Sequence, residues 1–83
     1  EKLLKLTVMA PERRTIVAGI AESYAPEELI GCQVLIVATM KPAKLMGIPS
    51  QGMVLAARAT VDGKDRLVLS TVRKTVPAGS RVA

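Results

Sequence analysis

The sequence contains no histidine and a single cysteine, Cys32. A disulfide within the chain is therefore impossible, and a metal site built from cysteine and histidine ligands is excluded. Ser-His and Cys-His nucleophilic pairs are excluded too, because both use histidine as the base. The adjacent acids Glu27 and Glu28 are better explained as the first turn of a helix than as an acid/base pair. We therefore expect a protein that is not an enzyme and that uses no cofactor and no metal.

Aromatic residues are almost absent, and Tyr24 is the only one. The core must be aliphatic, with Tyr24 as a packing anchor. Proteins that bind single strands without sequence preference rely on aromatic stacking, for which one tyrosine is no platform. Readers of folded RNA use phosphates and 2′-hydroxyls instead. The composition therefore favours structured RNA over single-stranded DNA.

Long apolar runs are also missing. No stretch reaches the roughly 18 residues that a membrane helix needs. The first residues, EKLLKLTV, lack the apolar region of a secretory signal. We expect a cytoplasmic protein with no membrane partner.

Positive charge is in excess, with 12 Lys and Arg against seven acids and a net charge of +5 over 83 residues. A basic balance indicates acidic partners, nucleic acid first and an anionic membrane surface second. The alternative is a soluble basic domain whose charge only keeps it dispersed. The length predicts one domain covering residues 1–83.

The hydropathy pattern predicts a mostly β fold. Apolar alternation or β-branched runs predict strands at 3–8, 15–20, 32–40, 53–61 and 67–72, with a short closing strand at best near the C-terminus. Residues 25–31, APEELIG, predict one helical turn, and Asp62-Gly63 predicts a hairpin turn. Five strands with a helix after the second indicate a small five-stranded barrel of the oligonucleotide-binding (OB) kind, although another small barrel or a sandwich fits the pattern as well.

The connection at residues 41–53, KPAKLMGIPSQGM, is the most unusual segment. It is longer than the four to six residues that are typical between elements, and a longer connection is generally functional or disordered. Lys41 and Lys44 are candidates for phosphate contacts, with Pro42 stiffening the backbone between them. The alternative for both lysines is a solvated loop.

Several motifs in the middle of the chain are similar to those of one family. They are GIAESY at 19–24, PEEL-x-G at 26–31, MKP at 40–42, K-x-x-G-x-x-S-x-G-M at 44–53 and LAA at 55–57. The VPAG-x-R-V ending at 76–82 fits too. The sequence thus resembles the tRNA-binding domain of bacterial methionyl-tRNA synthetases, of free-standing tRNA-binding proteins and of endothelial-monocyte-activating-polypeptide-like proteins.

The resemblance implies an OB fold that holds tRNA, commonly as a homodimer or appended to an aminoacyl-tRNA synthetase, without activity of its own. Carried over by position, the RNA-binding candidates are Lys41, Lys44, Ser50, Gly52 and Met53, and we add Arg58. Ser50 has the alternative of a turn-forming serine, and Met46 that of core packing. Arg13, Arg14, Arg73 and Lys74 either extend the basic surface or are scattered surface charge.

Three departures from the family pattern stand out. Thr39 and Met40 replace Asn-Leu before Lys-Pro, and Cys32-Gln33 replaces a lysine-rich segment. The chain also opens on what corresponds to the second strand of the family's barrel. We expect either a trimmed or rearranged form of the domain, or an edge that its own C-terminal segment or a partner covers. Two alternatives for function follow: a protein-binding, chaperone-like surface around Met46 and Met53, or a dimerisation module only.

Overall fold

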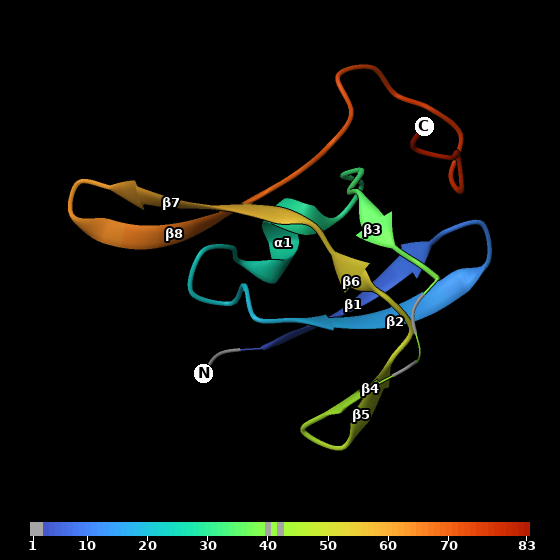
Figure 1. Ribbon diagram of the computed structural model, residues 1–83, viewed down its shortest axis with the longest axis horizontal. Helices are drawn as coiled ribbons and strands as arrows, with labels where there is room; N and C mark the ends of the chain where they lie inside the picture. Colours follow the sequence, from blue (N-terminus) through green and yellow to red (C-terminus); the bar gives the residue numbers. More distant parts are fainter. Residues whose placement is uncertain (1–2, 40, 42) are drawn as a thin grey trace.

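Four two-stranded antiparallel ladders form the regular structure of the computed structural model, which describes residues 3–39, 41 and 43–83 (Figure 1). The pairs are β1 (Leu4–Met9) with β2 (Arg13–Ala18), β3 (Ile36–Val37) with β6 (Met53–Val54), β4 (Ala43–Leu45) with β5 (Ile48–Ser50), and β7 (Ala56–Val61) with β8 (Lys64–Leu69). The mostly β fold that the sequence predicts is confirmed. Within the described residues the ladders do not join into a closed barrel, and a count of five strands is not confirmed.

The β1–β2 ladder carries the centre of the core. Leu4, Leu6 and Val8 alternate along β1 and are half-buried, as the apolar alternation predicts. Their partners on β2 include Ile16, which pairs with Leu6. The buried hydrophobic side chains of the described chain are Ile16, Val17, Ala18 and Ile20. The most deeply buried apolar residues therefore come from β2 and the residues just after it.

The helical turn α1 (Pro26–Leu29) forms where the sequence predicts it. Pro26 suits the first turn because its missing N–H would have no partner there. The backbone N–H of Ala25 donates to the Glu28 carboxylate at 2.7 Å, which closes the start of the helix. This helix has four residues and is the only one in the described chain, so no helix there is long enough to cross a membrane.

Tyr24 anchors the outer edge of β8. The backbone N–H of Leu69 donates to the Tyr24 hydroxyl oxygen at 2.9 Å, and that of Leu67 donates to Ser23 Oγ at 3.3 Å. Two amides that point away from β7 thereby gain partners, which an isolated sheet edge would leave to solvent. The single aromatic residue of the chain thus ties the base of the β7–β8 hairpin to the segment before α1.

The expected long strand at 32–40 is wrong in extent. Only Ile36–Val37 forms a strand, and both residues are half-buried rather than buried on two sides. Leu35 continues the β3–β6 register with one bond, accepting from Leu55 N–H at 2.9 Å, but its own N–H donates to Ser70 O at 3.1 Å. Leu55 accepts in turn from Ser70 N–H at 2.9 Å, so the expected strand 53–61 changes partner at Leu55, from β3 to β8, and consists of β6 and β7. Met40 lies outside the described residues.

The segment 41–53 is not a plain connection, because it contains the β4–β5 hairpin. Met46 and Gly47 form its two-residue turn with φ angles of 53° and 77°. Positive φ at both central residues matches the twist of the flanking strands. The predicted Asp62-Gly63 turn has the same φ angles, 53° and 77°, and that prediction is confirmed. Pro42 lies outside the described residues.

The C-terminal segment, residues 70–83, forms no strand. Gln33 holds it through two bonds: its Nε2 donates to Val76 O at 2.6 Å, and its Oε1 accepts from Val76 N–H at 3.1 Å. Further along, Gly79 packs so tightly on the turn between β1 and β2 that a Cβ there would lie 2.6 Å from Pro11 Cβ. The segment thus reaches the β1–β2 turn, and the expected closing strand is absent from it.

Gly79→Ala should release the C-terminal segment from the β1–β2 turn. A Cβ would overlap Pro11, and at a φ of +86° an L residue is strained by about 1–2 kcal/mol. We expect faster hydrogen exchange at the Val76 amide, which Gln33 now holds. Gly63→Ala is the matched control, because it adds a Cβ at a φ of +77° with nothing within 4 Å. Equal exchange at Val76 in both variants would contradict this packing.

Candidate nucleic-acid interface

Ser50, the last residue of β5, and Gln51, which follows it, fasten the β4–β5 hairpin to β2. The buried hydroxyl of Ser50 accepts from Val17 N–H at 3.0 Å and donates to Gly52 O at 3.0 Å. Gln51 N–H donates to Thr15 O at 2.7 Å, and Thr15 N–H donates to Gln51 Oε1 at 2.8 Å. We call this set of bonds the β2 clasp. Side-chain oxygens here satisfy outward-pointing amides of β2 that a neighbouring strand would otherwise bind.

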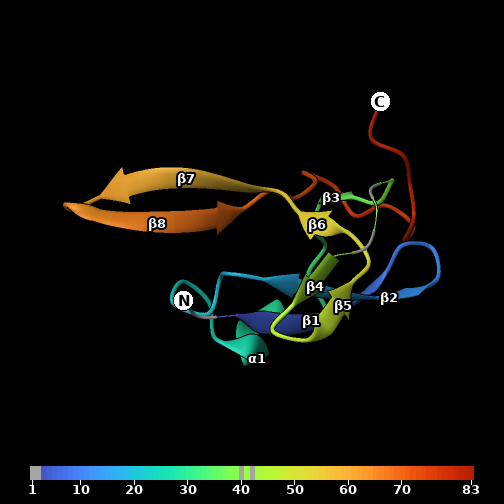
Figure 2. The same ribbon diagram turned by 60° about the horizontal axis from the view of Figure 1, so that its bottom comes forward.

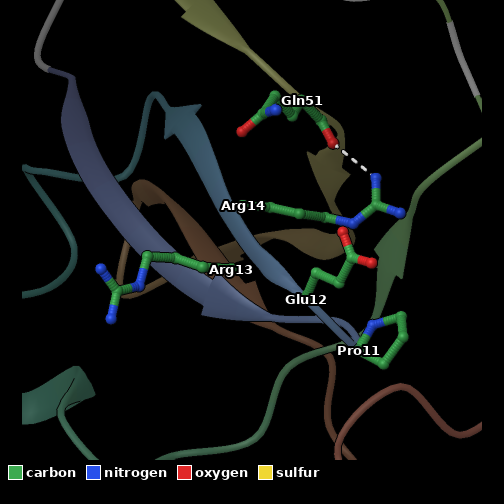
Figure 3. A pocket seen from close by; sticks show the side chains of 5 residues that line it. All are labelled: Pro11, Glu12, Arg13, Arg14 and Gln51. Carbon is green, nitrogen blue, oxygen red and sulfur yellow. Dashed lines mark hydrogen bonds between the residues drawn. The ribbon is translucent and has the colours of Figure 1, made fainter.

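Arg14 reinforces the β2 clasp from the other side of β2. Its Nε donates to Ala10 O at 2.8 Å, and its Nη1 donates to Gln51 O at 3.1 Å, with Ala38 O further away at 3.5 Å. Figure 3 shows the Arg14 guanidinium directed at Gln51, whereas Arg13 points to the opposite side of the β1–β2 ladder. The half-buried Arg14 therefore joins three segments through their carbonyl groups, and Arg13 keeps its charge toward solvent.

Ser50 and Gly52, both predicted to bind RNA, lie in the interior. Ser50 is only 5% exposed, and Gly52 is buried. Gly52 has a φ of +149°, and a Cβ there would lie 3.0 Å from Val37 O. Both features require glycine, because a side chain would strain the backbone and push β3 away. These two residues therefore hold the β4–β5 hairpin against β2, and neither of them is exposed for direct contact with RNA.

A basic, hydroxyl-bearing face lies beside the hairpin. Lys5 and Thr7 alternate with the half-buried leucines of β1 and are exposed. Thr15 and Arg13 pair with Thr7 and Met9, so their side chains share that face. A shallow groove of about 480 Å³ separates this face from β5, and its lining residues are Lys5, Thr15, Ile48, Pro49 and Gln51.

Lys5 was not among the residues predicted from the sequence. The signal was present in the pattern LLKLTV, because alternation already placed Lys5 and Thr7 on the side opposite the leucines. What the pattern could not supply was the neighbour across the groove. Only the β2 clasp brings Gln51 and Pro49 next to this face.

Of the remaining predicted residues, Lys44 has a groove residue as its pairing partner. It is exposed on β4 and pairs with Pro49, one of the groove residues. Lys41 is exposed as well. Met53, on β6, is 48% exposed, and Met46, at the tip of the hairpin, is 84% exposed. Core packing of Met46 is therefore wrong, because the turn carries its side chain into solvent.

Arg58 is set apart from this group. It is exposed on β7, in the β7–β8 hairpin, which extends from the body away from the β4–β5 hairpin in both views (Figures 1 and 2). Arg73 and Lys74 are exposed in the C-terminal segment. Lys5 therefore lines the groove, Arg13 lies on the same face of the β1–β2 ladder, and Lys44 pairs with the groove residue Pro49, whereas Arg58 lies in a separate hairpin.

The groove offers hydrogen-bond donors and positive charge, beside a short apolar wall of Ile48 and Pro49. No group of three metal-ligating side chains occurs among the described residues. Ammonium, guanidinium and hydroxyl groups on one face suit phosphate and sugar oxygens. These groups can bind the phosphates and sugars in the backbone of an anionic polymer.

Comparison with known proteins agrees with this chemistry. Residues 1–81 match the family model described as "Putative tRNA binding domain". The methionine–tRNA ligases of Thermotoga maritima and Archaeoglobus fulgidus are each 52% identical over 83 residues, 99% of this chain. That alignment spans 13% and 12% of the two ligases, so the chain corresponds to a small part of each.

Two solved structures share the fold. A MetRS-related protein from Pyrococcus horikoshii superposes with a TM-score of 0.84 and 41% identity, over 99% of this chain and 73% of that one. The chaperone CsaA of Bacillus anthracis superposes with a TM-score of 0.80 and 26% identity, over 98% and 74% of the two chains.

Ser50→Ala should lower the free energy of unfolding by about 1–3 kcal/mol, because it leaves the Val17 N–H without its acceptor in the protein interior. Chemical denaturation with urea measures the loss. Ser80→Ala is the control, since it removes a hydroxyl from an exposed turn and should change stability by less than about 0.5 kcal/mol. A loss for Ser50→Ala no greater than the control would show that the β2 clasp does not depend on this hydroxyl.

Proposed function

The chain belongs to the tRNA-binding domain family, and on that premise we propose that it binds structured tRNA along the exposed β1–β2 face and the β4–β5 hairpin. It is a binding domain and not a catalytic one. The observation that carries the proposal is the groove between the β1–β2 face and β5. Lys5 lines this groove, Arg13 lies on the same face of the ladder as Lys5, and Lys44 pairs with the groove residue Pro49. Lys41 joins them from the segment before β4, and Met53 provides an exposed apolar contact beside the clasp.

The chemistry of this surface favours recognition of RNA by its backbone. Cations meet phosphates, and such contacts fix the position of the nucleic acid without reading its sequence. The groove has no aromatic side chain on which an unpaired base could stack. A folded RNA that presents phosphates and 2′-hydroxyls at defined spacing suits it better than an extended single strand.

We further propose that the domain supplies tRNA affinity to a synthetase, either within one polypeptide or as a separate partner. The ligase relatives, in which this region is a small part, support the first arrangement. Tethering a general tRNA binder to an enzyme raises the effective concentration of tRNA at that enzyme without new specific contacts. A homodimer would present two such surfaces, and it belongs to the same proposal.

The double variant Lys41→Ala/Lys44→Ala should bind tRNA more weakly and with a flatter dependence on salt. Each phosphate contact contributes about 0.7 to 0.9 to the slope of log K against log salt concentration. Loss of two contacts should therefore reduce the slope by about 1.5. Titration of tRNA by fluorescence anisotropy at several salt concentrations measures it.

The matched control for that variant is Lys64→Ala/Arg66→Ala. It removes the same charge from the β7–β8 hairpin, which lies away from the groove (Figures 1 and 2). This control should keep most of the wild-type slope. Equal slopes for the two double variants would show that Lys41 and Lys44 do not contact tRNA and that only net charge affects binding.

The second candidate function is the binding of unfolded polypeptide. The similarity to the chaperone CsaA favours it, together with the exposed side chains of Leu45, Met46 and Met53. Flexible methionine side chains adapt to varied apolar partners. Met46→Ser should weaken binding of a permanently unfolded protein several-fold if this function operates, while tRNA affinity stays unchanged. Absence of any such binding by the wild type would dismiss this candidate.

A further inference from the structure

Gln51 is held more firmly than an exposed glutamine usually is. Its backbone N–H donates to Thr15 O at 2.7 Å, and its backbone carbonyl accepts from Arg14 at 3.1 Å. Its side-chain Oε1 accepts from Thr15 N–H at 2.8 Å. Both the backbone and the side chain of Gln51 are therefore fixed relative to β2 before any ligand arrives.

The bond to Thr15 also settles which way the Gln51 amide faces. A backbone N–H can only donate, so the atom that meets it must be the amide oxygen. The amide nitrogen, Nε2, is then directed away from β2, and no described residue accepts a hydrogen bond from it. Because Gln51 is exposed, the structure offers two N–H bonds in a fixed orientation to whatever occupies the groove.

The surroundings of Nε2 match the parts of a ribonucleotide backbone. Gln51 lines the groove with Lys5, Thr15, Ile48 and Pro49. It also lines a second hollow, of about 330 Å³, with Pro11, Glu12, Arg13 and Arg14 (Figure 3). In the groove the ammonium group of Lys5 suits a phosphate, and the wall formed by Ile48 and Pro49 suits the carbon face of a sugar. A neutral donor in a groove that also holds a cation and an apolar wall suits a neutral acceptor between phosphate and sugar carbons.

We propose that Gln51 Nε2 donates a hydrogen bond to a ribose 2′-hydroxyl, so that this groove distinguishes RNA from DNA. The inference rests on the proposed function and names the group that its site reads. The 2′-hydroxyl is the acceptor that DNA lacks, and folded RNA displays it along the wide minor groove of its helices. Because Gln51 is held in place by Thr15, little side-chain entropy is lost when the bond forms.

The test compares a tRNA made with 2′-O-methyl sugars and the same sequence made with 2′-fluoro sugars. Both keep the sugar pucker of RNA and neither 2′ group can donate a hydrogen bond, but only the ether oxygen is a good acceptor. The variant is Gln51→Glu, which retains an oxygen for Thr15 N–H and loses the Nε2 donor. The wild type should bind the 2′-O-methyl tRNA more tightly than the fluoro form, and Gln51→Glu should reduce this ratio by about 3- to 10-fold, the worth of one neutral hydrogen bond.

Two controls separate this role from a structural or a charge effect. Hydrogen exchange at the Thr15 amide should stay slow in Gln51→Glu, which reports that the β2 clasp is intact. Lys5→Gln should weaken binding of both probes and leave their ratio unchanged. The added charge of Gln51→Glu repels both probes alike and so does not alter the ratio.

The possible results test the role of Gln51 separately from tRNA binding by the domain. A reduced ratio with slow Thr15 exchange supports the proposal. An unchanged ratio in Gln51→Glu, or a wild type that binds both probes equally, overturns the role of Gln51 while tRNA binding stands. A wild type that binds neither probe and no unmodified tRNA overturns the proposed function as well.

Discussion

The hydrogen bonds that tie Ser50 and Gln51 to β2 are the contacts on which the rest of the structure depends. Without them the β4–β5 hairpin would have no fixed position against the β1–β2 ladder. The next residue, Gly52, can lie close to Val37 only because the chain has been brought alongside β2 at Ser50. Through Gly52 the β2 clasp also sets where β6 begins and therefore where β3 pairs. A small domain with few buried side chains gains order from these specific polar bonds as well as from apolar packing.

Neighbouring residues take different parts in this arrangement. Arg14 uses its guanidinium on carbonyl groups of the protein, whereas Arg13, one position earlier, faces solvent on the other side of the ladder (Figure 3). Alternation along a strand is sufficient to separate the two roles. The same division occurs in the S-x-G-M motif. Ser50 and Gly52 form the interior, and Gln51 and Met53 lie on the outside. The S-x-G-M motif thus combines residues that build the interior with residues that are exposed to a ligand.

The sequence predicted what local patterns determine. The alternation in LLKLTV, the Asp62-Gly63 turn and the PEEL turn all form as expected, because each depends on a few adjacent residues. The β4–β5 hairpin escaped prediction since Met46, not a typical turn residue, takes the positive φ. The strand predicted at 32–40 is shorter than expected, and the N–H of Leu35 binds Ser70, a residue distant in the chain, which no local pattern predicts. The resemblance to tRNA-binding domains is confirmed. The burial of Ser50 and the presence of Lys5 and Gln51 in one groove depend on tertiary contacts, which local sequence patterns do not predict.

We propose that tRNA lies on the β1–β2 face and against the β4–β5 hairpin. Backbone amide chemical shifts followed by NMR during a tRNA titration test this placement, because every strand reports separately. We expect the largest changes in residues 5–15 and 41–53, with small changes in the β7–β8 hairpin at 56–69. Changes concentrated in the β7–β8 hairpin, with residues 5–15 and 41–53 unaffected, would contradict it.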